Sequence, residues 1–246
     1  MSNQNTPVSS NTADVWHIIF RRERWFALLS LTVMVLISWL YLIQMAMMMP
    51  DMSQTISSNE VMQRNMHSWS LSTFFYMLLM WIIMMIGMMI PSAAPTILAY
   101  DSIGKTTKQY AHTFAFTLGY LAVWSLFSLL ATLLQWGLTE ASLLSPMMMT
   151  NSPLVGAALL ICAGIYQCLP IKQRCLIRCR SPFEFLTMYL KPGTNGGFWM
   201  GVQHGNYCLG CCWVLMLLLF VGGVMNILWI AILTVFVLME KVMPFG

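Results

Sequence analysis

Long apolar segments that are nearly free of charged side chains recur along this sequence from residue 26 to residue 239. Inside a lipid bilayer, the backbone N–H and C=O groups of such a segment are satisfied when it forms a helix that bonds to itself. Charged residues make up 8% of the chain against 59% hydrophobic residues, which leaves too little charge to cover a water-soluble surface. We therefore predict an all-α, polytopic bundle of about six transmembrane helices, which span residues 26–48, 71–90, 112–136, 153–169, 199–221 and 224–239.

Lysine and arginine predict the orientation of these helices, because loops rich in these residues stay on the cytoplasmic side of a membrane. With six spans, the basic residues outside the spans fall on one side, except for Arg64. We therefore predict that both termini are cytoplasmic. The residues that define the cytoplasmic side are Arg21, Arg22, Arg24, Lys105, Lys108, Lys172, Arg174, Arg178, Arg180, Lys191 and Lys241.

The same charge pattern argues against a nucleic-acid partner, although the formal net charge is +4. The basic residues flank separate apolar segments and form no continuous stripe that a phosphate backbone could follow. At the end of the sixth span, we predict that Glu240 pairs with Lys241 at the membrane interface.

Local signals divide the chain into a short N-terminal segment and one transmembrane domain. Residues 1–15 are rich in Asn, Ser and Thr, and we predict that they are disordered. Residues 14–25 are predicted to form a short helix along the membrane interface, so residues 1–25 make up the N-terminal segment. Residues 26–246 form the transmembrane domain. Pro91 and Pro95 are predicted to kink or end the second span, and Gly222-Gly223 to join the last two spans as a hairpin.

A histidine and three cysteines converge on one face of the fifth span. At about 100° per residue, His204, Cys208 and Cys211 fall within about 60° of one another on a helix, with Cys212 on the flank. One imidazole and two or three thiols form a soft ligand set that suits Cu(I) or Zn(II). We predict a metal site here. The alternative is that these cysteines pack as small apolar residues and that His204 bonds a neighbouring helix.

Methionine is the second unusual feature, with 24 residues in the chain. Thioethers are soft, neutral ligands that favour Cu(I), although methionine is also a flexible core residue. The second span runs inward and the fifth outward, so Met84 and Met88 are predicted to lie at the depth of His204 and Cys208 and to line an approach to them. Other methionines crowd the predicted outer loops, where they could collect Cu(I).

Two further cysteines, Cys175 and Cys179, lie in the basic segment between the fourth and fifth spans. Four residues apart, they can meet on one helical turn, where they could exchange Cu(I) with the cytoplasm or form a redox pair. The seven cysteines are odd in number and cluster late in the chain, which does not fit a disulfide framework. We find no Walker loop, dinucleotide fingerprint or Ser/His/Asp arrangement in a supporting context, and the sequence favours a protein that is not an enzyme.

Five segments carry a resemblance to a known family: MMIGMMIPSAAP at 84–95, residues 175–183, 204–213 and 223–226, and Glu240-Lys241. Together they resemble an uncharacterised bacterial family described as predicted metal-binding integral membrane proteins. The resemblance extends from about residue 70 to the end of the sequence, and the run 204–213 is its most specific part. It implies metal binding and location in a bacterial inner membrane, and it implies no established reaction.

Three functions remain open at this point. The first is a copper-handling membrane protein that transports Cu(I) or delivers it to a cuproenzyme, and this is our prediction, with zinc or haem as alternative metals or cofactors. The second is a membrane oxidoreductase that uses the Cys208–Cys211 pair or a haem bound by His67, His112 or His204, although no two of these histidines are spaced as a pair on one helix. The third is a non-catalytic accessory subunit of a larger membrane complex.

Overall fold

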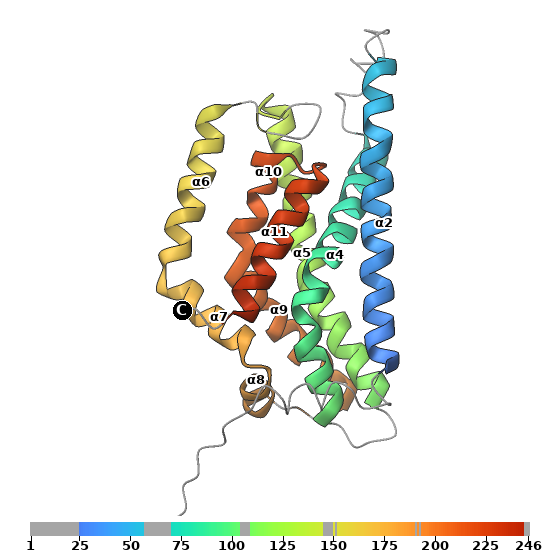
Figure 1. Cartoon of the computed structure of the whole chain (residues 1–246), viewed down its shortest axis with the longest axis vertical. Helices are drawn as coiled ribbons and strands as arrows, with labels where there is room; N and C mark the ends of the chain where they lie inside the picture. The colour runs from blue at the N-terminus through green and yellow to red at the C-terminus, as the bar shows by residue number, and fades with distance from the viewer. Residues whose placement is uncertain are drawn as a thin grey trace, which may run out of the picture.

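The computed structural model describes residues 25–56, 70–103, 109–144, 150, 152–189, 191 and 193–243. Within these ranges 91% of the chain is helical and no strand occurs, which confirms the predicted all-α class. Residues 1–24 and most of the predicted outer-loop methionines lie outside the described ranges. The helices are α2 (Trp25–Ile56), α4 (Leu71–Ile103), α5 (Gln109–Glu140), α6 (Pro153–Cys168), α7 (Pro170–Arg180), α8 (Pro182–Tyr189), α9 (Gly193–Leu217), α10 (Leu219–Gly222) and α11 (Ile227–Val242) (Figure 1).

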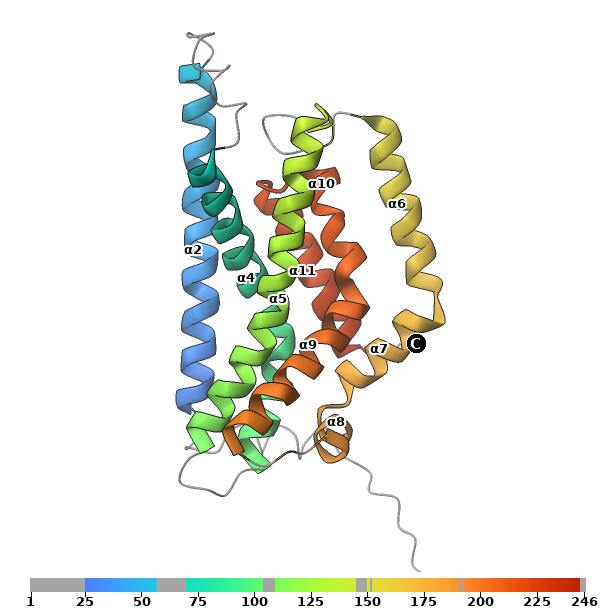
Figure 2. The same cartoon turned by 180° about the vertical axis from the view of Figure 1, so that it is seen from behind.

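The long helices stand side by side and alternate in direction along the chain (Figure 1). Helices α2 and α5 run in one direction and α4 returns between them, while α6 descends along the outside of the bundle. Helices α7 and α8 then turn toward the start of α9, which runs along α5 (Figure 2). The buried core lies between α4, α5, α9 and α11 and includes Trp81, Tyr120, Trp124 and Met216.

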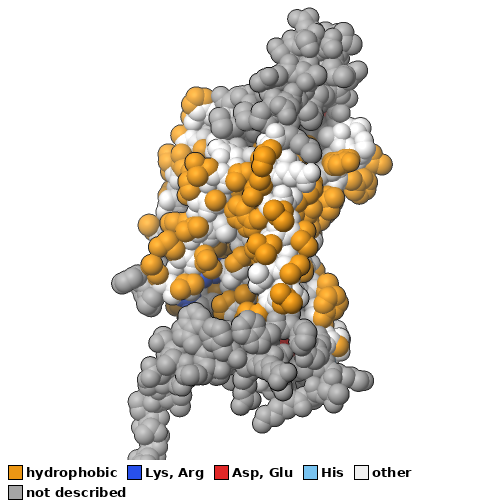
Figure 3. Space-filling view, turned by 45° about the vertical axis from the view of Figure 1, so that its right-hand side comes forward, with side chains coloured by type: hydrophobic (Ala, Val, Ile, Leu, Met, Phe, Trp, Pro, Cys, Tyr) orange, Lys and Arg blue, Asp and Glu red, His pale blue; other side chains and the backbone are white. Residues whose placement is uncertain are grey.

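The face of the bundle drawn in Figure 3 carries many exposed apolar side chains. Four helices of the described chain are long and apolar enough to cross a membrane, at Ala27–Met47, Leu71–Ser102, Ala111–Glu140 and Gly193–Gly222. The bent pair α6 and α7 would form a fifth span. The predicted sixth span corresponds to α11, which has 16 residues, fewer than the roughly 20 that cross a bilayer. Length and composition therefore support four to five spans, and the sixth span and the orientation stay predictions.

Helix α4 continues through Pro91 and Pro95 to Ile103, whereas the sequence predicted a span that ends or kinks at residue 90. Pro91 has no N–H to donate to the carbonyl of Gly87, four residues earlier. The indole Nε1 of Trp39, on the neighbouring α2, donates to this carbonyl at 3.3 Å. A tertiary hydrogen bond therefore replaces the missing one, as occurs at prolines in membrane helices.

Glycines bring α5 and α9 into direct backbone contact. A Cβ on Gly201 of α9 would clash with the carbonyl oxygen of Phe116 on α5, and a Cβ on Gly119 of α5 would clash with the carbonyl oxygen of Phe198 on α9. Small residues at such positions allow membrane helices to approach closely without a polar contact. This close approach holds the first half of α9, which precedes the cysteines, against α5.

Candidate metal site

A bend in the chain places the two cysteines of α7 beside α9. Helix α7 begins at Pro170 after an angle of 66° from α6. Proline suits the first helical position, because the N–H that it lacks would have no partner there. In both Figure 1 and Figure 2 α7 runs beside α9. Since Cys175 and Cys179 are four residues apart, both lie on the same face of α7.

Five of the seven cysteines therefore meet where α7 packs on α9. The thiol of Cys179 lies close enough to Cys208 and Cys211 to interact with both. The Sγ of Cys175 lies 2.9 Å from the position that a Cβ on Gly210 would take, so the absent side chain of Gly210 makes room for this sulfur. The five cysteines are Cys175, Cys179, Cys208, Cys211 and Cys212. Cys175 is half-buried and the other four are buried, and all five are free thiols.

Cys208 has partners on two other helices. Its Sγ lies 3.1 Å from the Tyr120 hydroxyl of α5 and 2.9 Å from the Lys241 Nζ of α11. The same Nζ donates to the Ser92 Oγ of α4 at 2.8 Å, and the Tyr120 hydroxyl donates to the carbonyl of Met89 at 3.1 Å. Residues of α4, α5, α9 and α11 are thus joined at one fully buried sulfur.

Cys211 and Cys212 turn their thiols toward their own helix. Each Sγ donates to the carbonyl oxygen of Cys208 at 3.0 Å. Among the described residues, no group of three or more His, Cys, Asp or Glu side chains is arranged to hold a metal ion.

His204 lies one helical turn before Cys208 and is 2% exposed. Its ring is surrounded by Phe116, Tyr120 and Phe185, with ring centroids 6.0, 5.8 and 5.2 Å away. Its Nδ1 is buried and has no hydrogen-bond partner, which is rare for a buried polar atom. Phe185, on α8, also lines a surface cavity of about 240 Å³, so this ring lies between the imidazole and the cavity.

Met84 and Met88 are fully buried in the core cluster that also contains Cys208, Cys211 and Cys212. Tyr120 and Lys241, which both contact Cys208, also bond to Met89 and Ser92 of α4. Met89 and Ser92 therefore lie at about the same depth in the bundle as Cys208. At 1.5 Å per residue, Met88 lies next to this level and Met84 about 6 Å farther along the helix. No contact joins Met84 or Met88 directly to His204 or Cys208 among those described above, so their common depth stays a prediction.

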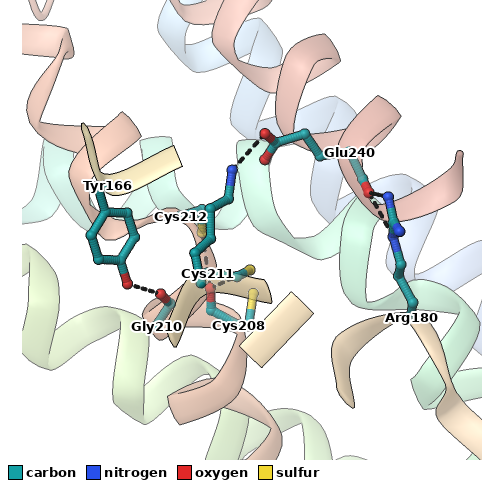
Figure 4. Close-up of polar contacts among 8 residues, drawn as sticks. Tyr166, Arg180, Cys208, Gly210, Cys211, Cys212 and Glu240 are labelled. Carbon is teal, nitrogen blue, oxygen red and sulfur yellow. Dashed lines mark hydrogen bonds and ion pairs between the residues drawn. The ribbon is translucent and has the colours of Figure 1, made fainter. Parts of the chain in front are cut away.

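Glu240 does not pair with Lys241, so that prediction was wrong. Its carboxylate pairs with the Lys172 Nζ of α7 at 2.6 Å, and the Arg180 Nε donates to its main-chain carbonyl at 2.8 Å (Figure 4). Consecutive residues of a helix point about 100° apart. Glu240 therefore faces α7, while Lys241 faces the buried thiols.

The same part of the chain carries a family match. Residues 78–246 match PpoB2, a family described as copper chaperone. The chain belongs to this family. The match includes every cysteine together with Met84, Met88, His204 and Lys241, and it begins after α2. No curated protein and no solved structure matches the chain.

Membership of a copper chaperone family agrees with the copper prediction, and it leaves the liganding residues as predictions. The sequence pointed to all five clustered cysteines but placed Cys175 and Cys179 in a loop apart from the others. It missed Tyr120, Ser92 and the direction of Lys241. No local pattern marks Tyr120 or Ser92, because their contact with Cys208 depends on the register between helices.

Proposed function

We propose that this protein is a membrane-embedded copper chaperone that holds Cu(I) at the cysteine cluster and delivers it to a cuproenzyme. The observation that carries the proposal is the contact of Cys179 on α7 with Cys208 and Cys211 on α9. Thiolates are soft ligands that select Cu(I), and two helices supply them from opposite sides. The family description independently names copper as the cargo.

Loading of the site requires a small rearrangement of side chains and no change of fold. Cys179 and Cys208 lie in contact, so they are the first pair of ligands in this proposal. Cys211, with Cys212 as an alternative, approaches the ion as a neutral thiol when it leaves the Cys208 carbonyl, so the bound ion keeps two thiolate ligands. Cys175 is nearer the surface than the other four, which suits a thiol that exchanges Cu(I) with the cytoplasm.

His204 and the methionines of α4 have separate roles in this proposal. The unpartnered Nδ1 of His204 is an available ligand one turn from Cys208, on the path toward Phe185 and its cavity. Met88 and Met84 line the approach from the opposite side of the membrane. Neutral thioethers release an ion more readily than thiolates, and a pathway requires sites that the ion can leave.

The proposal is tested by Cu(I) binding to the purified full chain without oxygen. Cys179→Ser with Cys208→Ser should abolish stoichiometric Cu(I) binding. The matched control is Cys162→Ser with Cys168→Ser, because these two cysteines are exposed on α6. Equal copper content in the two double variants would reject the thiol cluster as the cargo site. The haem-dependent and accessory-subunit alternatives stay predictions that no contact of the described residues favours.

A further inference from the structure

Lys241 is a half-buried lysine whose ammonium contacts a thiol and a hydroxyl. Its Nζ contacts the Cys208 sulfur at 2.9 Å and the Ser92 hydroxyl at 2.8 Å. In the part of the chain that the structure describes, Glu240 forms its ion pair with Lys172, and no carboxylate pairs with Lys241.

An ammonium inside a membrane bundle needs a negative partner, because burial of an unpaired charge is costly. The partner that the geometry supplies is the Cys208 sulfur at 2.9 Å, which in this pair would be a thiolate. Ser92 fixes the position of the ammonium by accepting a second hydrogen bond from it. The ammonium therefore has a fixed position beside the proposed copper ligands, and its positive charge affects any ion that binds there.

We infer that Lys241 gives the thiol site its preference for a monovalent over a divalent metal ion. The inference rests on the proposed function, since it assigns a specificity-determining residue to that same site. Cu(I) held by two thiolates carries one net negative charge, which the Lys241 ammonium neutralises. Zn(II) on the same two thiolates is already neutral, so the ammonium would remain as an uncompensated positive charge.

The binding step is a ligand exchange without electron transfer. Two Cu–S bonds form, the ligands of the copper donor leave, and a thiol that is still protonated gives its proton to the medium as it binds. The Lys241 ammonium keeps its protons and exchanges a bare thiolate for a copper-bound thiolate as its partner. Because the charge balance changes little on loading, the membrane interior does not oppose entry of Cu(I).

The test compares affinities for the two metals in the same variants. Purified full-length protein is titrated without oxygen against chromophoric chelators of Cu⁺ and, separately, of Zn²⁺. Lys241→Gln keeps a hydrogen-bond donor and removes the charge. We expect Cu(I) affinity to fall by about tenfold or more and Zn(II) affinity to rise. Lys241→Met removes the charge in a second way, should the amide prevent folding.

Two controls separate charge from structure. Lys241→Arg keeps the charge and should retain the preference for Cu(I). Lys172→Gln removes the buried lysine of α7, which pairs with Glu240, and should leave the preference unchanged. Equal losses for both metals in the neutral variants, or no change for either, would overturn the inference while the proposed function stands. A wild-type protein that binds no Cu(I) at Cys179 and Cys208 would overturn both.

Discussion

The Nζ of Lys241 lies 2.9 Å from the Sγ of Cys208, although these residues belong to different helices and are 33 positions apart. This contact brings the end of α11 into the centre of the bundle beside the cysteines of α7 and α9. A surface lysine would have pointed toward lipid headgroups. Its inward direction makes the candidate copper site a charged centre as well as a cluster of sulfur ligands.

The contact of α5 with α9 predicts a large effect of a single methyl group. Gly201→Ala should lower the free energy of unfolding by about 1–3 kcal/mol or more, because the added Cβ meets the rigid backbone of Phe116. Thermal unfolding of the purified protein in detergent measures this loss. Gly164→Ala on α6, where no atom lies within 4 Å of the added Cβ, should be neutral or stabilising. Similar unfolding temperatures for the two variants would contradict the close packing.

The hydrogen bond from Trp39 to Gly87 predicts a coupling between two substitutions. Trp39→Phe should destabilise the protein by about 0.5–1.5 kcal/mol, because the Gly87 carbonyl loses its donor. With Pro91→Ala already present, the restored backbone N–H bonds the same carbonyl, and Trp39→Phe should then cost less. A double-mutant cycle on the free energies of unfolding measures this coupling. Purely additive effects would show that Trp39 does not compensate for Pro91.

Because the Nδ1 of His204 has no hydrogen-bond partner, we expect that replacing this histidine slows Cu(I) transfer without loss of stability. His204→Phe replaces the imidazole with a ring that suits its three aromatic neighbours, so the free energy of unfolding should stay level or rise by about 1–3 kcal/mol. Transfer of bound Cu(I) to a chelator should become slower. His112→Phe, at the start of α5, is the control and should leave transfer unchanged. A marked loss of stability in His204→Phe would mean that the imidazole is a structural hydrogen-bonding group.

The methionines of α4 predict a separation of binding from loading. Met84→Leu with Met88→Leu nearly preserves side-chain volume and should cost under about 1.5 kcal/mol for each substitution. Cu(I) added to the purified variant should still bind at the cysteines, while copper uptake or delivery in cells should be slower. Wild-type copper flux in this variant would show that these methionines serve only as core residues.

The orientation of the bundle is testable with two exposed glutamates at opposite ends. Glu140 ends α5 and Glu184 lies on α8. In a variant without other reactive cysteines, Glu140→Cys should react with an impermeant maleimide in intact cells. Glu184→Cys should react only after the membrane is opened. The reverse pattern would place the basic α7 segment outside and invert the predicted topology.

Local sequence information was sufficient wherever helix geometry alone fixes the arrangement. The apolar segments predicted an all-α protein, and the spacing of His204, Cys208 and Cys211 predicted one shared face of α9. The structure buries all three on this helix. The rise and rotation of an α-helix are nearly constant, so residues within two turns have a relative position that the sequence reveals.

Only the tertiary structure decided which helices supply the rest of the site. The bend at Leu169–Pro170 moved Cys175 and Cys179 from a predicted loop onto α9, and the packing of α11 turned Lys241 toward Cys208. The continuation of α4 through Pro91 likewise depends on Trp39 of another helix. Such contacts are set by the register and rotation of packed helices, which depend on side chains far apart in the chain. The sequence therefore determined the helices and the ligand types, and interhelical packing determined which sulfurs and which charge meet.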